Sequence, residues 1–89
     1  MSVTIKKFGA EWCGPCRALK PVLEQLKTEY AGKVTFVEYD VDNSPNEAMQ
    51  YSVTSIPLVI IEKDGALIER FQGLSSKMAY TNAINEGLK

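Results

Sequence analysis

Cys13 and Cys16, the only cysteines of this chain, are the residues best suited to chemistry, and only Gly14 and Pro15 separate them. The sequence contains no histidine, so it offers neither a Cys–His nucleophile pair nor the four Cys and His ligands of a structural zinc site. No metal site is therefore expected. A disulfide across so short a loop would restrict the unfolded chain little and would add little stability. Two neighbouring thiols in a reducing compartment more often perform redox chemistry.

The spacing predicts a reversible dithiol whose two sulfurs have different tasks. We expect Cys13 just before a helix, where backbone N–H groups and the helix dipole favour the thiolate and lower the thiol pKa. Cys16 would lie one turn later on the same face, more buried and holding its proton longer. Cys13 would then attack a substrate disulfide, and Cys16 would attack the sulfur of Cys13 and release the reduced substrate. Gly14 leaves room for a partner backbone, and Pro15 presets the helix start.

Seven elements are expected to position this pair within one domain, residues 1–89. Strand patterns occur at Val3–Phe8, Val34–Val41, Leu58–Ile61 and Ala66–Phe71. Helix patterns occur at Pro15–Tyr30, at Pro45–Tyr51 and after Gly73. The order βαβαββα predicts an α/β fold that starts with a right-handed parallel crossover and ends with a hairpin at Asp64-Gly65. The sheet is expected to be four-stranded and mixed, with helices on both faces.

Local signals also predict how the helices begin and which faces they bury. The first helix should bury one stripe, formed by Ala18, Leu19, Val22, Leu23, Leu26 and Tyr30, and should kink at Pro21. Ser44 and Glu47 match a capping box for the second helix. Ser75 or Ser76 should cap the last helix, which is expected to bury Met78, Tyr80, Ile84 and Leu88.

Charge and hydropathy limit the classes of partner and the cellular location that the sequence favours. The formal net charge is −1, and no block of like charges occurs, which disfavours nucleic acid or an anionic membrane as the partner. No apolar run is long enough to cross a bilayer. The first residues, from Met1 to Lys7, alternate like a strand and lack the apolar core of a signal peptide. The expected location is the cytoplasm, the alternative being an exported protein whose leader has been cleaved.

The segment Trp12-Cys13-Gly14-Pro15-Cys16 resembles the active site of the thioredoxin family. The resemblance covers nearly the whole chain, through Phe8, Ala10, Glu11, Pro21, Asp42, Pro45, the dipeptide Ile56-Pro57 and Gly73. It implies a thioredoxin fold, a protein-disulfide reductase and a cis peptide bond before Pro57. It also implies that the backbone of Ile56 pairs with the substrate chain beside the nucleophile. The implied docking surface consists of Trp12, Gly14, Pro15, Ile56, Pro57, Gly73 and Leu74.

The resemblance further implies which molecules serve the reaction. The substrates would be disulfide-containing proteins, and a thioredoxin reductase, linked to NADPH or to ferredoxin, would recharge the dithiol. No cofactor beyond the Cys13–Cys16 disulfide is implied, and the protein would be a monomer. The chain resembles a minimal thioredoxin that lacks the usual N-terminal strand and helix. Gly9 stands where typical thioredoxins carry a tryptophan, so packing behind the active site should differ.

Lys7 and Glu38 are the most informative departure from the family pattern. Typical thioredoxins carry a buried aspartate and a partner lysine at these two positions, so the charges appear in exchanged order. Strand periodicity places Lys7 on the face of Val3 and Ile5, which predicts a partly buried ion pair with Glu38 beneath the cysteines. The family aspartate is implicated in proton transfer at the resolving cysteine; here either Glu38, directly or through water, or no residue takes that role. The alternative is that both side chains are solvated along the sheet.

Two other functions stay open at this point. One is a glutaredoxin-like oxidoreductase coupled to glutathione, which Gly14-Pro15 disfavours because glutaredoxins usually carry an aromatic residue inside the motif. The other is a protein-binding module that uses the same groove without needing redox turnover.

Overall fold

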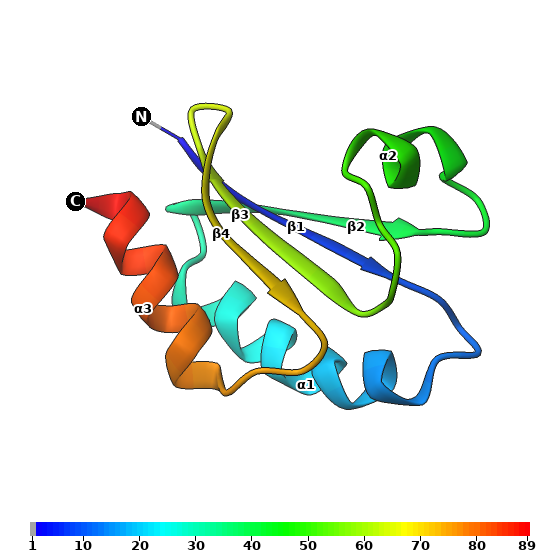
Figure 1. Cartoon of the computed structure of the whole chain (residues 1–89). Helices are drawn as coiled ribbons and strands as arrows, with labels where there is room; N and C mark the ends of the chain where they lie inside the picture. Colours follow the sequence, from blue (N-terminus) through cyan, green and yellow to red (C-terminus); the bar gives the residue numbers. More distant parts are fainter. Residues whose placement is uncertain (1) are drawn as a thin grey trace.

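The computed structural model describes residues 2–89, and Met1 lies outside them. Seven elements follow in the predicted order βαβαββα (Figure 1). They are β1 (Val3–Gly9), α1 (Gly14–Glu29), β2 (Val34–Asp40), α2 (Pro45–Gln50), β3 (Leu58–Lys63), β4 (Ala66–Gln72) and α3 (Lys77–Leu88). The sequence patterns therefore located every element, with bounds that differ by one or two residues.

The four strands form one mixed sheet in the order β2-β1-β3-β4. The central strand β1 pairs in parallel with β2 and antiparallel with β3, and β3 pairs antiparallel with β4. Helices α1 and α3 lie on one face of the sheet and α2 on the other (Figure 1). The predicted mixed sheet with helices on both faces is thus confirmed. This topology places β1, whose end leads into the cysteine motif, between β2 and β3.

Two apolar clusters fill the space on either side of the sheet. The larger one joins Val3, Ile5, Val59 and Ile61 to residues of α1 and α3. The smaller one, on the side of α2, contains Phe8, Leu58 and Ile60. Successive residues of β3 contribute to opposite clusters, which explains why its sequence is continuously apolar. Burial on both faces holds β1 and β3 rigidly, and the site is built at their ends.

The hairpin between β3 and β4 forms at Asp64-Gly65, as predicted. Both residues have positive φ, 51° and 86°, which suits a tight turn that matches the twist of the strands. A register irregularity between Ile61 and Glu62 accompanies it. The turn is tied to the start of β1, because the backbone N–H of Ser2 donates to the Asp64 carboxylate at 2.7 Å.

The predicted apolar stripe of α3 was wrong in part. Tyr80, Ile84 and Gly87 are buried, whereas Met78 is 72% exposed and Leu88 is also exposed. The buried residues are spaced by four and three positions and share one helix face, while Met78, two positions before Tyr80, points away from it. Gly87 takes the last core position because Val3 packs closely against it.

Four further details of the helices can be compared with expectation. On α1, Leu19, Leu23 and Leu26 are buried, and Val22 and Tyr30 are partly buried against the same core, as predicted. Ala18 is exposed, so its place in the stripe was wrong. The helix continues through Pro21. Ser44 begins α2, but its side chain makes no capping hydrogen bond, so the capping box was wrong. Its backbone has φ −129° and ψ 57°, outside the extended geometry that such a cap needs. Ser76 caps α3 by accepting a hydrogen bond from the Ala79 N–H.

Candidate active site

Cys13 and Cys16 form a disulfide at the start of α1. Cys13 is the N-cap residue, and its Sγ accepts a hydrogen bond from the Cys16 N–H at 3.2 Å. Pro15 occupies the first helical turn, where its missing N–H costs nothing. A sulfur at the N-cap lies where free backbone N–H groups and the helix dipole stabilise negative charge. The predicted difference in exposure is slight, because Cys13 is 5% and Cys16 3% exposed.

The segment that leads into the disulfide is fixed by side chains on both sides. Trp12 is 66% exposed, and its Nε1–H donates a hydrogen bond to the Asp42 carboxylate at 2.9 Å. The guanidinium of Arg17 donates to the carbonyl oxygen of Glu11, at 2.9 Å from Nη2. A large aromatic side chain held in solvent by a hydrogen bond is suited to contact with a partner. The sequence placed Trp12 here, but it did not show that Asp42 holds it.

The second part of the site comes from the loops after α2 and β4. The peptide bond between Ile56 and Pro57 is cis, as the resemblance implied. Gly73 has a φ of 80°, which favours glycine, and its N–H donates to the carbonyl oxygen of Pro57 at 2.8 Å. Leu74 follows with an exposed side chain. The structure therefore joins the predicted positions Pro57 and Gly73 directly.

An apolar hollow lies between Trp12 and the cis-proline loop. Its lining consists of Trp12, Val41, Ala48, Val53, Thr54, Ser55 and Ile56. Only Trp12 and Ile56 were among the predicted site residues. The others belong to the end of β2, to α2 and to the loop after it. Their sequence signal was an apolar pair, Val41 and Val53, on either side of the short helix α2. The hollow is an apolar surface beside Trp12, the residue that precedes Cys13.

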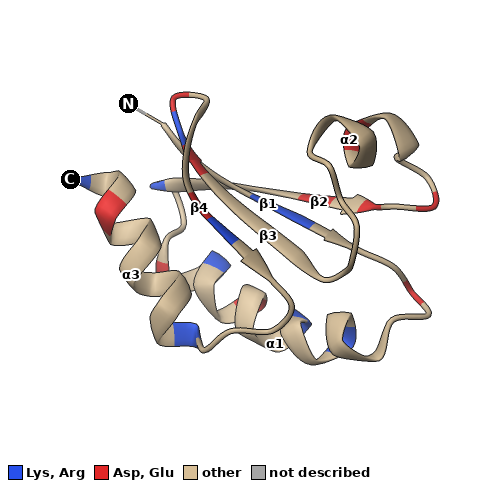
Figure 2. Cartoon of the chain, viewed as in Figure 1, with Lys and Arg blue, Asp and Glu red and all other residues tan. Residues whose placement is uncertain are grey.

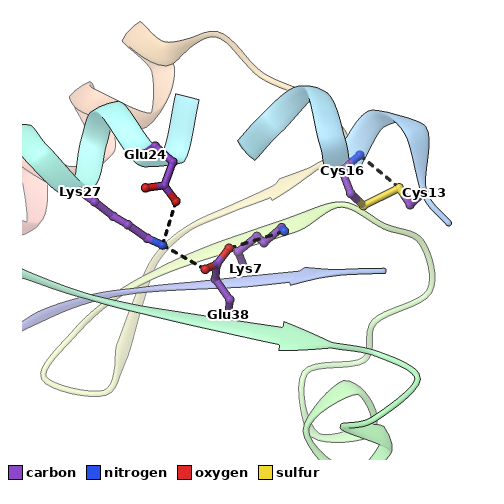
Figure 3. Close-up of polar contacts among 6 residues, drawn as sticks. All are labelled: Lys7, Cys13, Cys16, Glu24, Lys27 and Glu38. Carbon is purple, nitrogen blue, oxygen red and sulfur yellow. Dashed lines mark hydrogen bonds and ion pairs between the residues drawn. A yellow bond between two sulfur atoms is a disulfide. The ribbon is translucent and has the colours of Figure 1, made fainter. Parts of the chain in front are cut away.

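Lys7 and Glu38 are partners in register on β1 and β2, as strand periodicity predicted. Lys7 Nζ lies 3.7 Å from Glu38 Oε1, and the two side chains are 15% and 45% exposed. The ion pair is therefore buried mainly on its lysine side. Sequence reasoning missed Lys27, which reaches from α1 and places its Nζ 3.0 Å from the other Glu38 carboxylate oxygen (Figure 3). Glu24 joins the same cluster through Lys27.

The charges around Glu38 bear on its proposed part in proton transfer. The hydrogen bond from Lys27, together with the positive charges of Lys27, Lys7 and Lys20, lowers the pKa of Glu38 below its ordinary value. A proton carrier works best when its pKa lies near the operating pH. Glu38 is thus an ionised carboxylate at neutral pH and is poorly suited to carry protons to or from a cysteine.

Within residues 2–89, no three His, Cys, Asp or Glu side chains are grouped as they would be around a metal ion. No helix in the same range has the length and hydropathy needed to span a bilayer.

The comparisons with known proteins agree with one another. A model of the thioredoxin family matches residues 2–86. A thioredoxin of Chlamydia trachomatis is 49% identical over 79 residues, which cover 89% of this chain and 76% of the relative. A thioredoxin of Staphylococcus aureus is 38% identical over 97% of this chain and 83% of its own length. The crystal structure of Fasciola hepatica thioredoxin superposes with a TM-score of 0.87 at 35% identity, over 97% of this chain and 81% of that one. With a disulfide of the predicted spacing at the start of α1, these matches show that the chain belongs to the thioredoxin family and is a protein thiol–disulfide oxidoreductase.

Proposed function

We propose that Cys13 is the attacking cysteine and Cys16 the resolving one. The observation that carries this assignment is the position of Cys13 Sγ at the N-cap of α1, where it accepts the Cys16 N–H. The same environment stabilises a thiolate on Cys13 after reduction. The Cys13 thiolate attacks a substrate disulfide, one substrate sulfur leaves as a thiolate, and a mixed disulfide forms. Cys16, as a thiolate, then attacks Cys13 Sγ, and the second substrate thiolate leaves.

The substrate chain is proposed to dock across the end of α1 and the two loops opposite it. The docking surface comprises Trp12, Gly14, Pro15, Ile56, Pro57, Gly73 and Leu74. The exposed side chains of Trp12 and Leu74 and the apolar hollow beside Ile56 support this assignment. Alanine built at Gly14 would meet no atom within 4 Å, so this position leaves space for a partner backbone. Ile56 would pair with the substrate through its backbone, next to Cys13.

Thioredoxins reduce disulfides with the dithiol form of a redox-active cysteine pair, and a thioredoxin reductase returns the oxidised pair to the dithiol. For this chain we propose that the reductase draws electrons from NADPH or from ferredoxin. We also propose that residues 1–89 act as one domain, as a monomer in the cytoplasm, with no cofactor beyond the Cys13–Cys16 pair. Acidic and basic residues are interspersed along the strands and helices (Figure 2), which suits protein substrates better than nucleic acid.

Trapping the mixed disulfide tests the assignment of the two cysteines. Cys16→Ser should accumulate a covalent adduct with a disulfide-containing protein such as insulin, because the resolving thiol is missing. Cys13→Ser is the matched control and should form no comparable adduct, because the remaining sulfur lies behind the docking surface. Both variants should lose turnover. An adduct that accumulates on Cys13→Ser, and not on Cys16→Ser, would reverse the assignment.

A further inference from the structure

Lys7 approaches the sulfur of Cys16 through the space that Gly9 leaves empty. Gly9 is buried at the end of β1, between the strand and the start of α1. A Cβ built on Gly9 would lie 3.2 Å from Cys16 Sγ and also 3.2 Å from Lys7 Nζ. The ammonium and the sulfur are therefore no more than twice 3.2 Å apart. Figure 3 shows the Lys7 side chain extending from Glu38 toward the disulfide.

The positive charge of Lys7 is only partly balanced by its acidic neighbour. Glu38 lies 3.7 Å from Lys7 but 3.0 Å from Lys27, so its carboxylate is shared and is closer to the other lysine. The charged residues that line the hollow beside Gly9 and Cys16 are Lys7, Glu11, Arg17, Lys20, Glu38 and Asp40. Arg17 is directed to the carbonyl of Glu11. Lys20 is exposed, so solvent screens its charge. Lys7 is the less exposed of the two lysines in this hollow.

We infer that Lys7 is a positioning residue that favours the charged, attacking form of the Cys16 sulfur. The inference rests on the proposed function, in which Cys16 resolves the mixed disulfide. A positive charge about 4–6 Å from an acidic group stabilises its ionised form and lowers its pKa by about 1–3 units. Lys7 acts through its charge alone, so no proton passes between the two side chains. When a substrate thiolate instead opens the Cys13–Cys16 bond, the electron pair moves to Cys16, and Lys7 stabilises the same thiolate.

Titration of Cys16 in a Cys13→Ser background tests the inference without requiring turnover. The Cys16 thiolate is followed by its ultraviolet absorbance as the pH rises. Adding Lys7→Met should raise the Cys16 pKa by about one unit or more, a tenfold loss of thiolate at any pH well below the pKa. Lys20→Met, which removes the same charge from the exposed side of the hollow, should change it much less. Equal shifts for the two variants, or none for Lys7→Met, would overturn the inference.

Glu38→Gln provides a second variant that moves the charge balance in the opposite direction. It removes the acidic neighbour and leaves the Lys7 charge unopposed, so the pKa of Cys16 should fall. A rise would contradict the inference, even if Lys7→Met proved too unstable to measure.

The reduction potential of the intact pair separates an electrostatic role from a merely structural one. Above the Cys16 pKa, Lys7 stabilises the thiolate of the reduced state. Lys7→Met should therefore lower the reduction potential by about 30 mV for each unit by which it raises the Cys16 pKa. Below that pKa the potentials of the two proteins should converge, because Cys16 is then a neutral thiol in both. A shift that is constant with pH would refute the electrostatic role. If the unaltered protein reduces no disulfide, the proposed function fails. If the unaltered protein reduces disulfides but Lys7→Met leaves the Cys16 titration unchanged, only this inference fails.

Discussion

Gly9→Ala tests the packing behind the disulfide, because a Cβ at Gly9 would occupy the space between Lys7 and Cys16. A Cβ at this position would lie 3.1 Å from Lys7 Cε and 3.2 Å from Cys16 Sγ. Ordinary contacts between such atoms are about 3.5–4.0 Å, so both neighbours must move. The end of the Lys7 side chain can rotate away, whereas the disulfide holds Cys16 Sγ in place.

The magnitude follows from two opposing effects. Overpacking a well-filled site typically costs about 1–3 kcal/mol. Replacing a glycine inside a strand recovers about 0.5–1 kcal/mol of backbone entropy. We therefore expect the oxidised Gly9→Ala protein to be about 1–2 kcal/mol less stable than the unaltered one. Urea unfolding measures this as a lower midpoint at an unchanged slope.

Gly14→Ala is the matched control for this experiment. A Cβ at Gly14 meets nothing within 4 Å, and the residue lies in the first turn of α1. Alanine favours helix over glycine by up to about 1 kcal/mol, so this variant should be as stable as the unaltered protein or more stable. A Gly9→Ala protein with an unchanged midpoint would refute the packing argument. So would an equal loss of stability in the two variants.

Four further predictions concern the fold and the redox pair. Lys6 pairs with Glu62 at 3.0 Å and donates to the Tyr51 hydroxyl, which raises the Lys6 pKa. Lys6→Met should cost about 1–3 kcal/mol, because Glu62 loses its ion-pair partner and keeps only the Tyr51 hydroxyl. Adding Glu62→Leu should restore part of this stability. A double variant that loses more stability than the two single variants together would contradict the pairing. Because folding raises the Lys6 pKa, the charged Lys6 stabilises the folded state. This contribution is complete below the unfolded pKa of about 10.4 and is lost as the pH rises further. Urea midpoints measured across alkaline pH would detect the loss. Ser76→Ala should cost about 1 kcal/mol of stability, since this side chain caps α3. Ser44→Ala removes no capping hydrogen bond and should cost less. Equal losses of stability in the two variants would refute the assignment of the caps. Equilibration with glutathione and dithiothreitol should give Cys13–Cys16 a potential near or below about −250 mV, and a value between about −230 and −120 mV would reverse the proposed electron flow.

Local patterns were sufficient for the secondary structure and for the cysteine pair. The continuously apolar run at β3 and the alternation in β1 each carry their signal within a few residues. The Cys13–Cys16 spacing likewise defines the disulfide within one helical turn. Errors arose where an element had to be oriented against others. Met78 was assigned to the core because it is apolar, although its position on α3 turns it toward solvent.

The sequence by itself determined the redox motif, the order of the elements and the strand faces that carry Lys7 and Glu38, since side-chain alternation fixes the face on which a residue lies. The register that sets Lys7 opposite Glu38 is a property of the folded sheet. Only the tertiary structure decided which groups from other elements meet them. Packing of α1 over the sheet brings Lys27 to Glu38, and the missing side chain of Gly9 lets Lys7 approach the sulfur of Cys16. Spacing within one element fixes the direction of a side chain, but its neighbours depend on which helix covers which strand and on the space between them.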